Sequence, residues 1–356
     1  MSAVAGAGAG ARSGGKVTAD LLAPLMRCAP AGDAMVVATI RGGERSVLTR
    51  GTAVDADSRF ELGSVTKTFT ALLLADAVAR GEVRLDDPLI TYLPPGSRPR
   101  WSSGVTLLHL ATHTAGLPRL PPGSLRTALP AWYSNPYAGY DESRLFELLG
   151  RTRVHARPGT RVTYSNLGVG LLGHLLARAA RLPYPDLVAD RLGGPLALTM
   201  TTCDPNEPQL TGHWHGRARP PWDMPGLPAA GALRSTATDL TRYLAAHLDP
   251  AVVAPPSLAT ALVEVRRPRL LRPDTGDRLC LVWNLRPRAD HDLIFHGGAT
   301  RGFTSFVGFS PQAGIALAAL VNTTPGPRGT FVQTAYETLR ALAADAMGGG
   351  PARPLM

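Results

Sequence analysis

Residues 61–89 read ELGSVTKTFTALLLADAVARGEVRLDDPL, and the serine and lysine near the start decide how this stretch is interpreted. Ser64 stands where a helix is expected to begin, and Lys67 follows three residues later. Positions i and i+3 share one face of an α-helix, so the lysine amine can reach the serine hydroxyl. A serine hydroxyl is a weak nucleophile that needs an adjacent base, and burial or positive neighbours can make a lysine partly neutral. The stretch predicts a nucleophile and its base at one helix start.

The scarcity of lysine strengthens this prediction. Only two of the 37 basic residues are lysines, Lys16 and Lys67, and Lys16 lies in an Ala- and Gly-rich N-terminal stretch. Arginine stays protonated in proteins and cannot replace lysine as a base. The densest arginine cluster is RRPRLLR at residues 266–272. It has no interleaved aromatic residues, so despite the net charge of +10 we expect a solvated surface loop there and no nucleic-acid partner.

A second motif, Tyr164-Ser165-Asn166, opens another apolar helix. A tyrosine hydroxyl close to a lysine amine can pass a proton between reacting groups. Residues two apart in an extended segment point the same way, so Tyr164 and Asn166 are expected to face one cleft. The same three letters recur at residues 133–135, but there they lie in a proline-rich loop with no helix after it. The Tyr164 motif is therefore preferred.

A third motif, His296-Gly297-Gly298-Ala299, ends the strand-like run DLIFH. Two glycines allow a substrate to approach the backbone closely. A strand edge at this point can offer an N–H group to a developing oxyanion. These four residues are therefore candidates for substrate binding.

The expected strands lie near both ends of the chain, with helices between them. Short β-rich runs occupy residues 34–40, 45–49, 278–285, 292–296, 303–309 and 314–322. Helical patterns lie within residues 18–28, 64–81, 105–113, 142–151, 166–180, 239–248 and 330–347. We expect an α/β (α+β) fold with one sheet built from both chain ends and flanked by helices. The expected parts are a flexible tail (1–17), an α/β domain (18–85 and 231–346) and a mainly helical insertion domain (86–230), with the active site between the two domains.

Together the motifs resemble the serine β-lactamase-like and penicillin-binding family, most closely its class C β-lactamase and esterase branch. Blocks that resemble this family continue at residues 105–118, 158–176, 229–244 and 296–311, in the right order. The resemblance covers about residues 18–345 and implies a β-lactamase/transpeptidase-like fold with an antiparallel sheet.

The resemblance also implies a role for each motif residue. Ser64 is implied as the acylated nucleophile, Lys67 as the group that takes its proton, and Tyr164 as the second general acid/base. Asn166 is implied to hydrogen-bond Lys67 and the substrate amide. The backbone N–H groups of Ser64 and Ala299 are implied to form the oxyanion hole.

One position departs from the family pattern. His296 stands where penicillin-binding enzymes usually carry the lysine of Lys-Thr-Gly, whose charge faces the substrate carboxylate. His-Gly-Gly versions are familiar among esterases, peptidases and acyltransferases of the family, which argues against efficient β-lactam hydrolysis. Arg301 lies close in sequence and is a candidate for the missing charge.

We therefore expect a serine acyl-transfer enzyme that works through a covalent acyl-enzyme on Ser64. The donor would be a small ester, thioester or amide. The acceptor would be water, as in an esterase, or an amine or alcohol, as in a transacylase of small-molecule biosynthesis. The alternatives are a true β-lactamase or D-Ala peptidase, and a non-catalytic sensor that binds acyl donors or β-lactams.

Other features of the sequence exclude several classes of protein. No P-loop and no G-x-G-x-x-G after a strand is present, so no nucleotide cofactor is expected. His213 and His215 lack supporting ligands, and His109 and His113 are interpreted as packing residues, so no metal is expected either. The three distant cysteines, Cys28, Cys203 and Cys280, indicate reduced thiols. Without a long apolar run or a signal-like start, we expect a cytoplasmic protein with no membrane partner.

Overall fold

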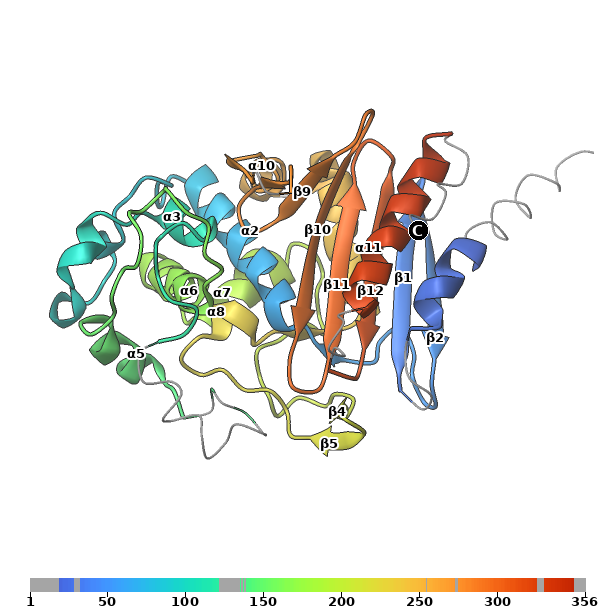
Figure 1. Ribbon diagram of the computed structural model, residues 1–356, viewed down its shortest axis with the longest axis horizontal. Coiled ribbons are helices and arrows are strands. Elements are labelled where there is room, and N and C mark those ends of the chain that lie inside the picture. The colour runs from blue at the N-terminus through green and yellow to red at the C-terminus, as the bar shows by residue number, and fades with distance from the viewer. Residues whose placement is uncertain are drawn as a thin grey trace, which may run out of the picture.

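An antiparallel sheet of eight strands forms the centre of the α/β part of the molecule (Figure 1). The computed structural model describes residues 19–28, 33–121, 135, 137, 139–253, 255–272, 275–324 and 330–348. Across the sheet the order is β2 (Glu44–Arg50), β1 (Met35–Arg41), β12 (Ile315–Val321), β11 (Thr304–Ser310), β10 (Asp292–Ala299), β9 (Asn284–Pro287), β8 (Arg278–Leu279) and β7 (Leu270–Leu271). Every neighbouring pair is antiparallel. The sheet is thus built from both chain ends, as predicted.

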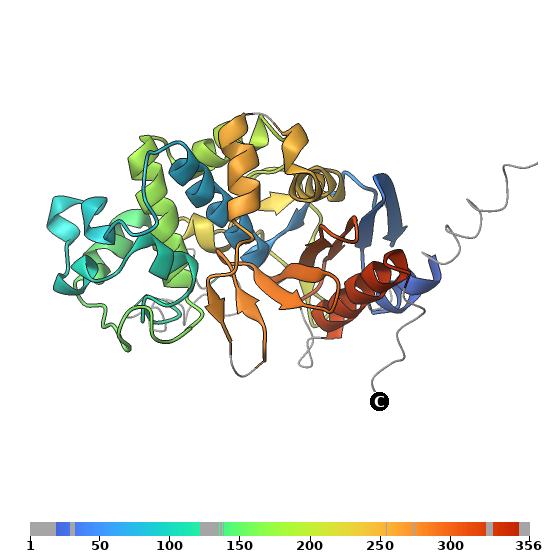
Figure 2. The ribbon, with the colours of Figure 1, turned by 90° about the horizontal axis from the view of Figure 1, so that it is seen from above.

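Helices cover both faces of the central strands. Successive residues of a strand point to opposite faces, and in β1 Met35 packs with Leu339 of α11 (Thr330–Ala346). The next residue, Val36, belongs to the larger core that includes Leu240 of α9 (Ala237–Leu248). The N-terminal helix, residues 19–26, lies beside α11 (Figure 2). Because both faces are buried, these strands are almost continuously apolar.

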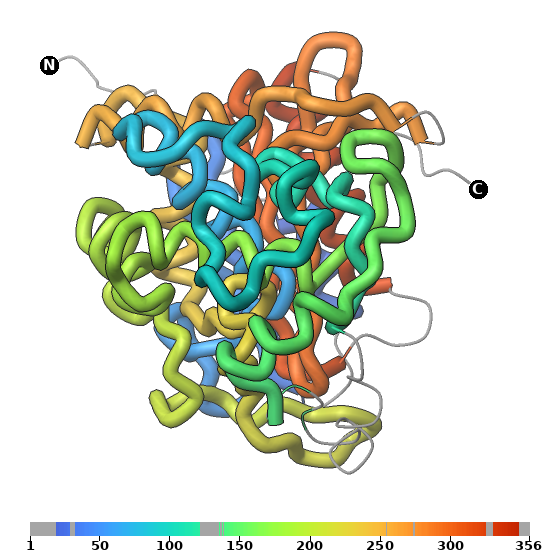
Figure 3. Tube along the Cα trace, turned by 90° about the vertical axis from the view of Figure 1, so that its left-hand side faces the viewer, coloured from blue at the N-terminus to red at the C-terminus, as the bar shows by residue number. Residues whose placement is uncertain are grey.

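The other side of the molecule is mainly helical and is built around α2 (Thr66–Ala79) (Figure 3). The first twelve residues of α2 are buried. The short 3-10 turn η1 (Gly63–Val65) precedes it. The other helices on this side are α3 (Leu107–Ala111), α5 (Glu142–Leu149), α6 (Asn166–Ala180), α7 (Tyr184–Val188), α8 (Pro228–Gly231) and α10 (Pro256–Glu264), of which α6, α8 and α10 pack against α2. Two pairs of short strands complete the fold: β3 (Phe60–Glu61) with β6 (Arg234–Ser235), and β4 (Gly212–Trp214) with β5 (Arg217–Arg219).

All seven expected helices are present, but two local predictions are wrong. The run 278–285 is not one strand, because Cys280 N–H donates to Trp283 O in a tight turn, and Val282 takes φ +67° there. The arginine-rich segment 266–272 is not simply a loop, since Leu270–Leu271 pairs with Arg278–Leu279 as the edge strand β7. Periodicity cannot show a pairing that depends on distant partners.

The expected two-domain division stays a prediction. The segment 86–230 carries α3, α5, α6, α7 and α8 but also the β4–β5 hairpin. The expected tail, residues 1–17, lies outside the described residues. Within the described ranges, no helix combines the length and apolarity needed to cross a bilayer.

Candidate active site

The turn that carries Ser64 is held against the strand that carries the third motif. Gly63 adopts φ +50°, a left-handed conformation that favours glycine. A Cβ atom on Gly63 would lie only 2.4 Å from the backbone oxygen of Ala299. From the neighbouring strand, Ser305 Oγ donates a hydrogen bond of 2.7 Å to Leu62 O. The Ser64 turn and the end of β10 are therefore in direct backbone contact.

Ser64 Oγ accepts hydrogen bonds from the other two predicted catalytic residues. Lys67 Nζ lies 2.9 Å away, one helical turn further along the same face. Tyr164 OH lies 2.6 Å away, although Tyr164 is 100 residues distant in sequence. The structure thus places an amine and a phenol on one serine hydroxyl, a geometry that allows proton transfer in both directions.

The Lys67 amine is fully buried, with 0% of the residue exposed. Besides Ser64, it donates to Ala230 O of α8 at 2.6 Å. Burial lowers the pKa of Lys67 below its ordinary value because the charged ammonium is poorly solvated, and the positive charge of Arg119 acts in the same direction. The adjacent Tyr164 opposes this shift of the Lys67 pKa. A lowered pKa increases the fraction of neutral amine that can act as a base.

Tyr164 is held in place by the groups that surround its ring. The imidazole of His113 lies 4.6 Å from it, centroid to centroid. Lys67 Nζ and the Arg119 guanidinium lie over the ring at 5.0 and 5.4 Å from its centroid. These distances are in the range of cation–π contacts. The ring is thus enclosed by one neutral and two basic side chains.

The residue after Tyr164 anchors it to the start of α6. Ser165 is the N-cap of this helix, and its Oγ accepts from Gly168 N at 2.9 Å. The same hydroxyl donates to Pro118 O at 2.6 Å. Ser165 N donates to His113 Nδ1 at 3.3 Å. These three contacts fix the segment that presents Tyr164 to the nucleophile.

The implied hydrogen bond between Asn166 and Lys67 is not formed. Asn166 Nδ2 instead donates to Tyr137 OH at 3.0 Å. The Lys67 amine is already bonded to Ser64 Oγ and Ala230 O. Asn166 Oδ1 is buried and has no hydrogen-bond partner among the described residues. Buried acceptors are nearly always paired, so this oxygen is an exception among the polar atoms around the site.

The third motif presents a neutral histidine beside the nucleophile. His296 is 5% exposed, and its Nδ1 donates to Gly297 O at 2.8 Å, since a carbonyl can only accept. Burial, together with the charge of Lys67, lowers the pKa of His296 to about 4. At neutral pH this position therefore carries no positive charge.

Gly298 allows the nucleophile turn to approach β10 closely, whereas the sequence predicts a close approach of substrate there, which stays a prediction. A Cβ atom at this position would lie 2.1 Å from Leu62 O, inside the backbone of the nucleophile turn. A Cβ on Gly63 would lie 2.8 Å from Ala299 N. The two segments that carry the predicted oxyanion donors, the N–H groups of Ser64 and Ala299, therefore adjoin. Their role as donors stays a prediction.

Three residues near the site were missed in the sequence: His113, Tyr137 and Arg119. The interpretation of His109 and His113 as packing residues agrees with their contacts, since His109 caps α3 through Thr106 and the buried His113 ring lies against Tyr164, but the sequence does not indicate that His113 lies at the site. Tyr137 lies just beyond residues 133–135, which repeat the letters of the Tyr164 motif. Of that motif only Asn135 is described, and its Nδ2 donates to Asp223 O at 2.6 Å. No periodic pattern marks these loop residues.

The other candidates form no second site. His213 lies on β4 and bonds Asn322, while His215 lies in the turn after this strand with φ +50°. The described ranges contain no group of three or more His, Cys, Asp or Glu side chains that could hold a metal ion. All three cysteines are free thiols.

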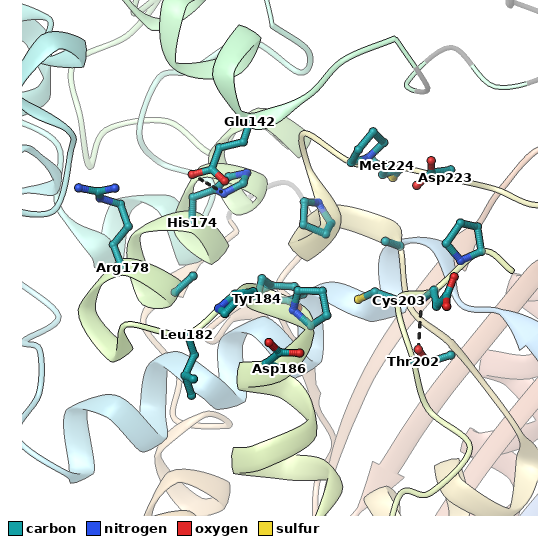
Figure 4. Close-up of a pocket in the computed structure, with 18 of the residues that line it drawn as sticks. Glu142, His174, Arg178, Leu182, Tyr184, Asp186, Thr202, Cys203, Asp223 and Met224 are labelled. Carbon is teal, nitrogen blue, oxygen red and sulfur yellow. Dashed lines mark hydrogen bonds and ion pairs between the residues drawn. The ribbon is translucent and has the colours of Figure 1, made fainter. Parts of the chain in front are cut away.

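A separate cavity of about 770 Å³ opens between α6, α7 and the segment around α8 (Figure 4). Its lining includes His174, Tyr184, Cys203 and Met224, but none of the three residues at the nucleophile. Tyr184 OH is bonded to Thr70 Oγ1 of α2 at 2.7 Å. The cavity therefore abuts the helix of Lys67 without reaching the reacting atoms.

Comparison with known proteins gives the family of this chain. Residues 19–342 match the family model described as Beta-lactamase. The chain belongs to the beta-lactamase family. It is 29% identical to a beta-lactamase of Escherichia coli K12, over 86% of this chain and 88% of that protein. It is 28% identical to the D-alanyl-D-alanine-carboxypeptidase/endopeptidase AmpH of the same organism, over 76% of this chain and 72% of that protein.

A solved structure supports the fold. A class C beta-lactamase superimposes with a TM-score of 0.79 at 22% identity, covering 92% of this chain and 96% of that one. The family assignment and the homologues identify a serine hydrolase of the beta-lactamase type.

Proposed function

We propose that this beta-lactamase family member transfers acyl groups through an ester on Ser64. The observation that carries the proposal is the pair of hydrogen bonds on Ser64 Oγ, 2.9 Å to Lys67 Nζ and 2.6 Å to Tyr164 OH. A non-catalytic binding protein has no need of a buried amine and a phenol on the same hydroxyl.

The proposed reaction has two steps. In the first, neutral Lys67 takes the Ser64 proton as Oγ bonds to the donor carbonyl, and Tyr164 protonates the leaving group as its bond to the carbonyl breaks. The N–H groups of Ser64 and Ala299 stabilise the oxyanion. In the second, Tyr164 removes a proton from the acceptor, which attacks the ester, and protonated Lys67 returns its proton to Ser64 Oγ as the ester bond breaks. Each proton that leaves Ser64 is thus returned.

We propose small esters and amides as donors, with water as the main acceptor. Hydrolysis is supported by the names of the relatives, a beta-lactamase and a D-alanyl-D-alanine-carboxypeptidase/endopeptidase. Asn166 Oδ1 has no hydrogen-bond partner among the described residues, which supports donors or acceptors with an N–H group. Amide donors and amine acceptors are therefore part of the proposal. Because His296 is neutral, β-lactams with their carboxylate are proposed as slower substrates than neutral esters.

Intact-mass spectrometry tests the proposal. The protein is mixed with a panel of activated esters and β-lactams, with and without amine acceptors, and compared with Ser64→Ala. We expect a covalent adduct on the wild type that is absent from the variant, together with turnover. Faster amide formation than hydrolysis would make the enzyme a transacylase. No adduct and no turnover with any donor would refute catalysis and favour a sensor.

A further inference from the structure

His113 holds the backbone on both sides of Tyr164. The amide N–H of Thr163 donates to His113 O at 2.7 Å, and the amide N–H of Ser165 donates to His113 Nδ1 at 3.3 Å. The imidazole lies against the Tyr164 ring, with 4.6 Å between the two centroids and 41° between the planes. One residue thus binds the peptide groups before and after Tyr164 and also contacts its side chain.

The backbone at position 113 favours glycine, yet it carries a histidine. After α3, Thr114 N donates to His109 O at 2.9 Å. His113 N donates to Leu110 O at 3.3 Å, which completes the Schellman motif that ends this helix. The motif places His113 in the left-handed region, with φ +57°, where a Cβ atom is unfavourable. Such strained positions cluster at active sites, where a side chain has a task that glycine cannot perform.

The ring of His113 offers an acceptor that a packing residue does not need. A backbone N–H can only donate, so Nδ1 accepts from Ser165 and the ring proton is on Nε2. Nε2 is buried and has no hydrogen-bond partner among the described residues. Burying an unpaired N–H is unfavourable, and a phenyl ring would avoid this cost. Burial lowers the pKa of His113 to about 3, so Nδ1 stays an acceptor at neutral pH.

We infer that His113 is a positioning residue, which orients Tyr164 for proton transfer at Ser64 through the bond from Ser165 N to its ring. Tyr164 OH lies 2.6 Å from Ser64 Oγ, and a displacement of about 1 Å in a reacting group can cost about 10²-fold in rate. The inference rests on the proposed role of Tyr164 as the acid that protonates the leaving group. His113 acts on that step through Tyr164 alone.

Two aryl esters that differ in their leaving group test the inference. Phenyl butyrate releases a phenoxide, which leaves more readily when Tyr164 protonates it. p-Nitrophenyl butyrate releases a stabilised anion that needs little protonation. The measured quantity is the ratio of kcat/KM for phenyl butyrate to kcat/KM for p-nitrophenyl butyrate. Taking this ratio within one variant cancels any loss of folded, active protein.

Three substitutions separate the acceptor from the ring. His113→Phe keeps a ring of similar size but removes the acceptor, and we expect it to lower the ratio about tenfold or more. His113→Gly also removes the acceptor but relieves the left-handed backbone, so it should fold and still show the lower ratio. His113→Asn keeps an acceptor, Oδ1, on a residue that tolerates this backbone, so its ratio should stay close to that of the wild type. A merely structural role predicts that phenylalanine is tolerated better than asparagine.

A double variant and a matched control complete the experiment. Tyr164→Phe should lower the ratio, and adding His113→Phe to it should lower the ratio no further, because the two residues act as one unit. His247→Phe likewise replaces a buried imidazole by a phenyl ring. Its ring packs on Tyr243, Trp283 and Phe309 of the core, so this variant should keep the wild-type ratio.

The outcomes separate this inference from the proposed function. An unchanged ratio in His113→Phe or His113→Gly, a lower ratio in His113→Asn than in His113→Phe, or a further fall in the double variant would overturn the positioning role while Ser64 still acylates. An unchanged ratio in Tyr164→Phe would show that Tyr164 is not the acid, and the inference would fail with that role. Failure of both esters to form an adduct on Ser64 would instead refute the acyl-transfer proposal, and the inference with it.

Discussion

Replacing Lys67 with methionine removes the proposed base while keeping a side chain of similar length. Tyr164 OH is the other side-chain group bonded to Ser64 Oγ in the described part of the chain, and it acts there as a donor. A positioned general base contributes about 10²- to 10⁴-fold to the rate, or about 3–5 kcal/mol at 1.36 kcal/mol per factor of ten. We expect the acylation rate of Lys67→Met to fall by that factor.

The same change has a smaller effect on stability. Methionine cannot donate to Ala230 O, which accepts from Lys67 at 2.6 Å, and leaving such a buried oxygen unpaired costs about 1–3 kcal/mol. Loss of the buried amine offsets part of this cost, since burial already disfavours its charged form. The assay is single-turnover release of p-nitrophenol from an activated ester, with urea unfolding of the same samples.

Thr70→Val is the matched control for Lys67→Met. Thr70 lies on the same helix, is also fully buried, and bonds Ala229 O and Tyr184 OH at 2.9 and 2.7 Å. It makes no contact with Ser64, so we expect a comparable loss of stability with near wild-type acylation. The reasoning is refuted if Lys67→Met acylates at the wild-type rate, or if Thr70→Val loses as much acylation as Lys67→Met.

Three further predictions concern the proton shuttle, the nucleophile turn and the buried histidines. Tyr164→Phe should slow both steps by about 10²-fold or more, seen in stopped-flow traces; unchanged deacylation would remove Tyr164 from the second step. Gly63→Ala meets Ala299 O at 2.4 Å, so urea unfolding should show a loss above 1–2 kcal/mol, the cost of left-handed backbone alone. Burial lowers the pKa of His113 and His247 to about 3. Below pH 6.5 these histidines are protonated in the unfolded chain but stay neutral in the folded one, so acid favours unfolding. Between pH 6 and pH 4 the free energy of unfolding should therefore fall by about 1.4 kcal/mol for each pH unit and each such histidine. His247→Phe should flatten this fall, and an unchanged slope would contradict it.

The reactive core of the site could be predicted because short-range rules define it. Helical spacing places Lys67 next to Ser64, and the rarity of lysine in this chain marks the position. The glycines of the third motif mark a place of close approach, but the sequence predicts a substrate there, and the structure places the backbone of Leu62 against Gly298. The sheet followed from β-rich runs at both chain ends. These features depend on residues near one another in sequence.

The surroundings of the site could not be predicted, because they depend on distant loops. The carbonyl of Ala230 and the imidazole of His113 reach the site through tertiary packing that no periodic pattern records. The predicted bond between Asn166 and Lys67 is wrong for the same reason. Lys67 donates to Ala230 O on α8, and Asn166 donates to Tyr137, which lies in a distant loop. The break at Val282 equally depends on a long-range bond, from its N–H to Ala111 O.

The position of the acyl group is the most direct test of the account. After reaction with an activated ester, the enzyme is quenched in acid, digested and analysed by peptide mass spectrometry. We predict that the added mass lies on Ser64 and disappears at the rate of turnover. Stable acylation of another residue, or turnover with no acyl group on the Ser64 peptide, would contradict the mechanism.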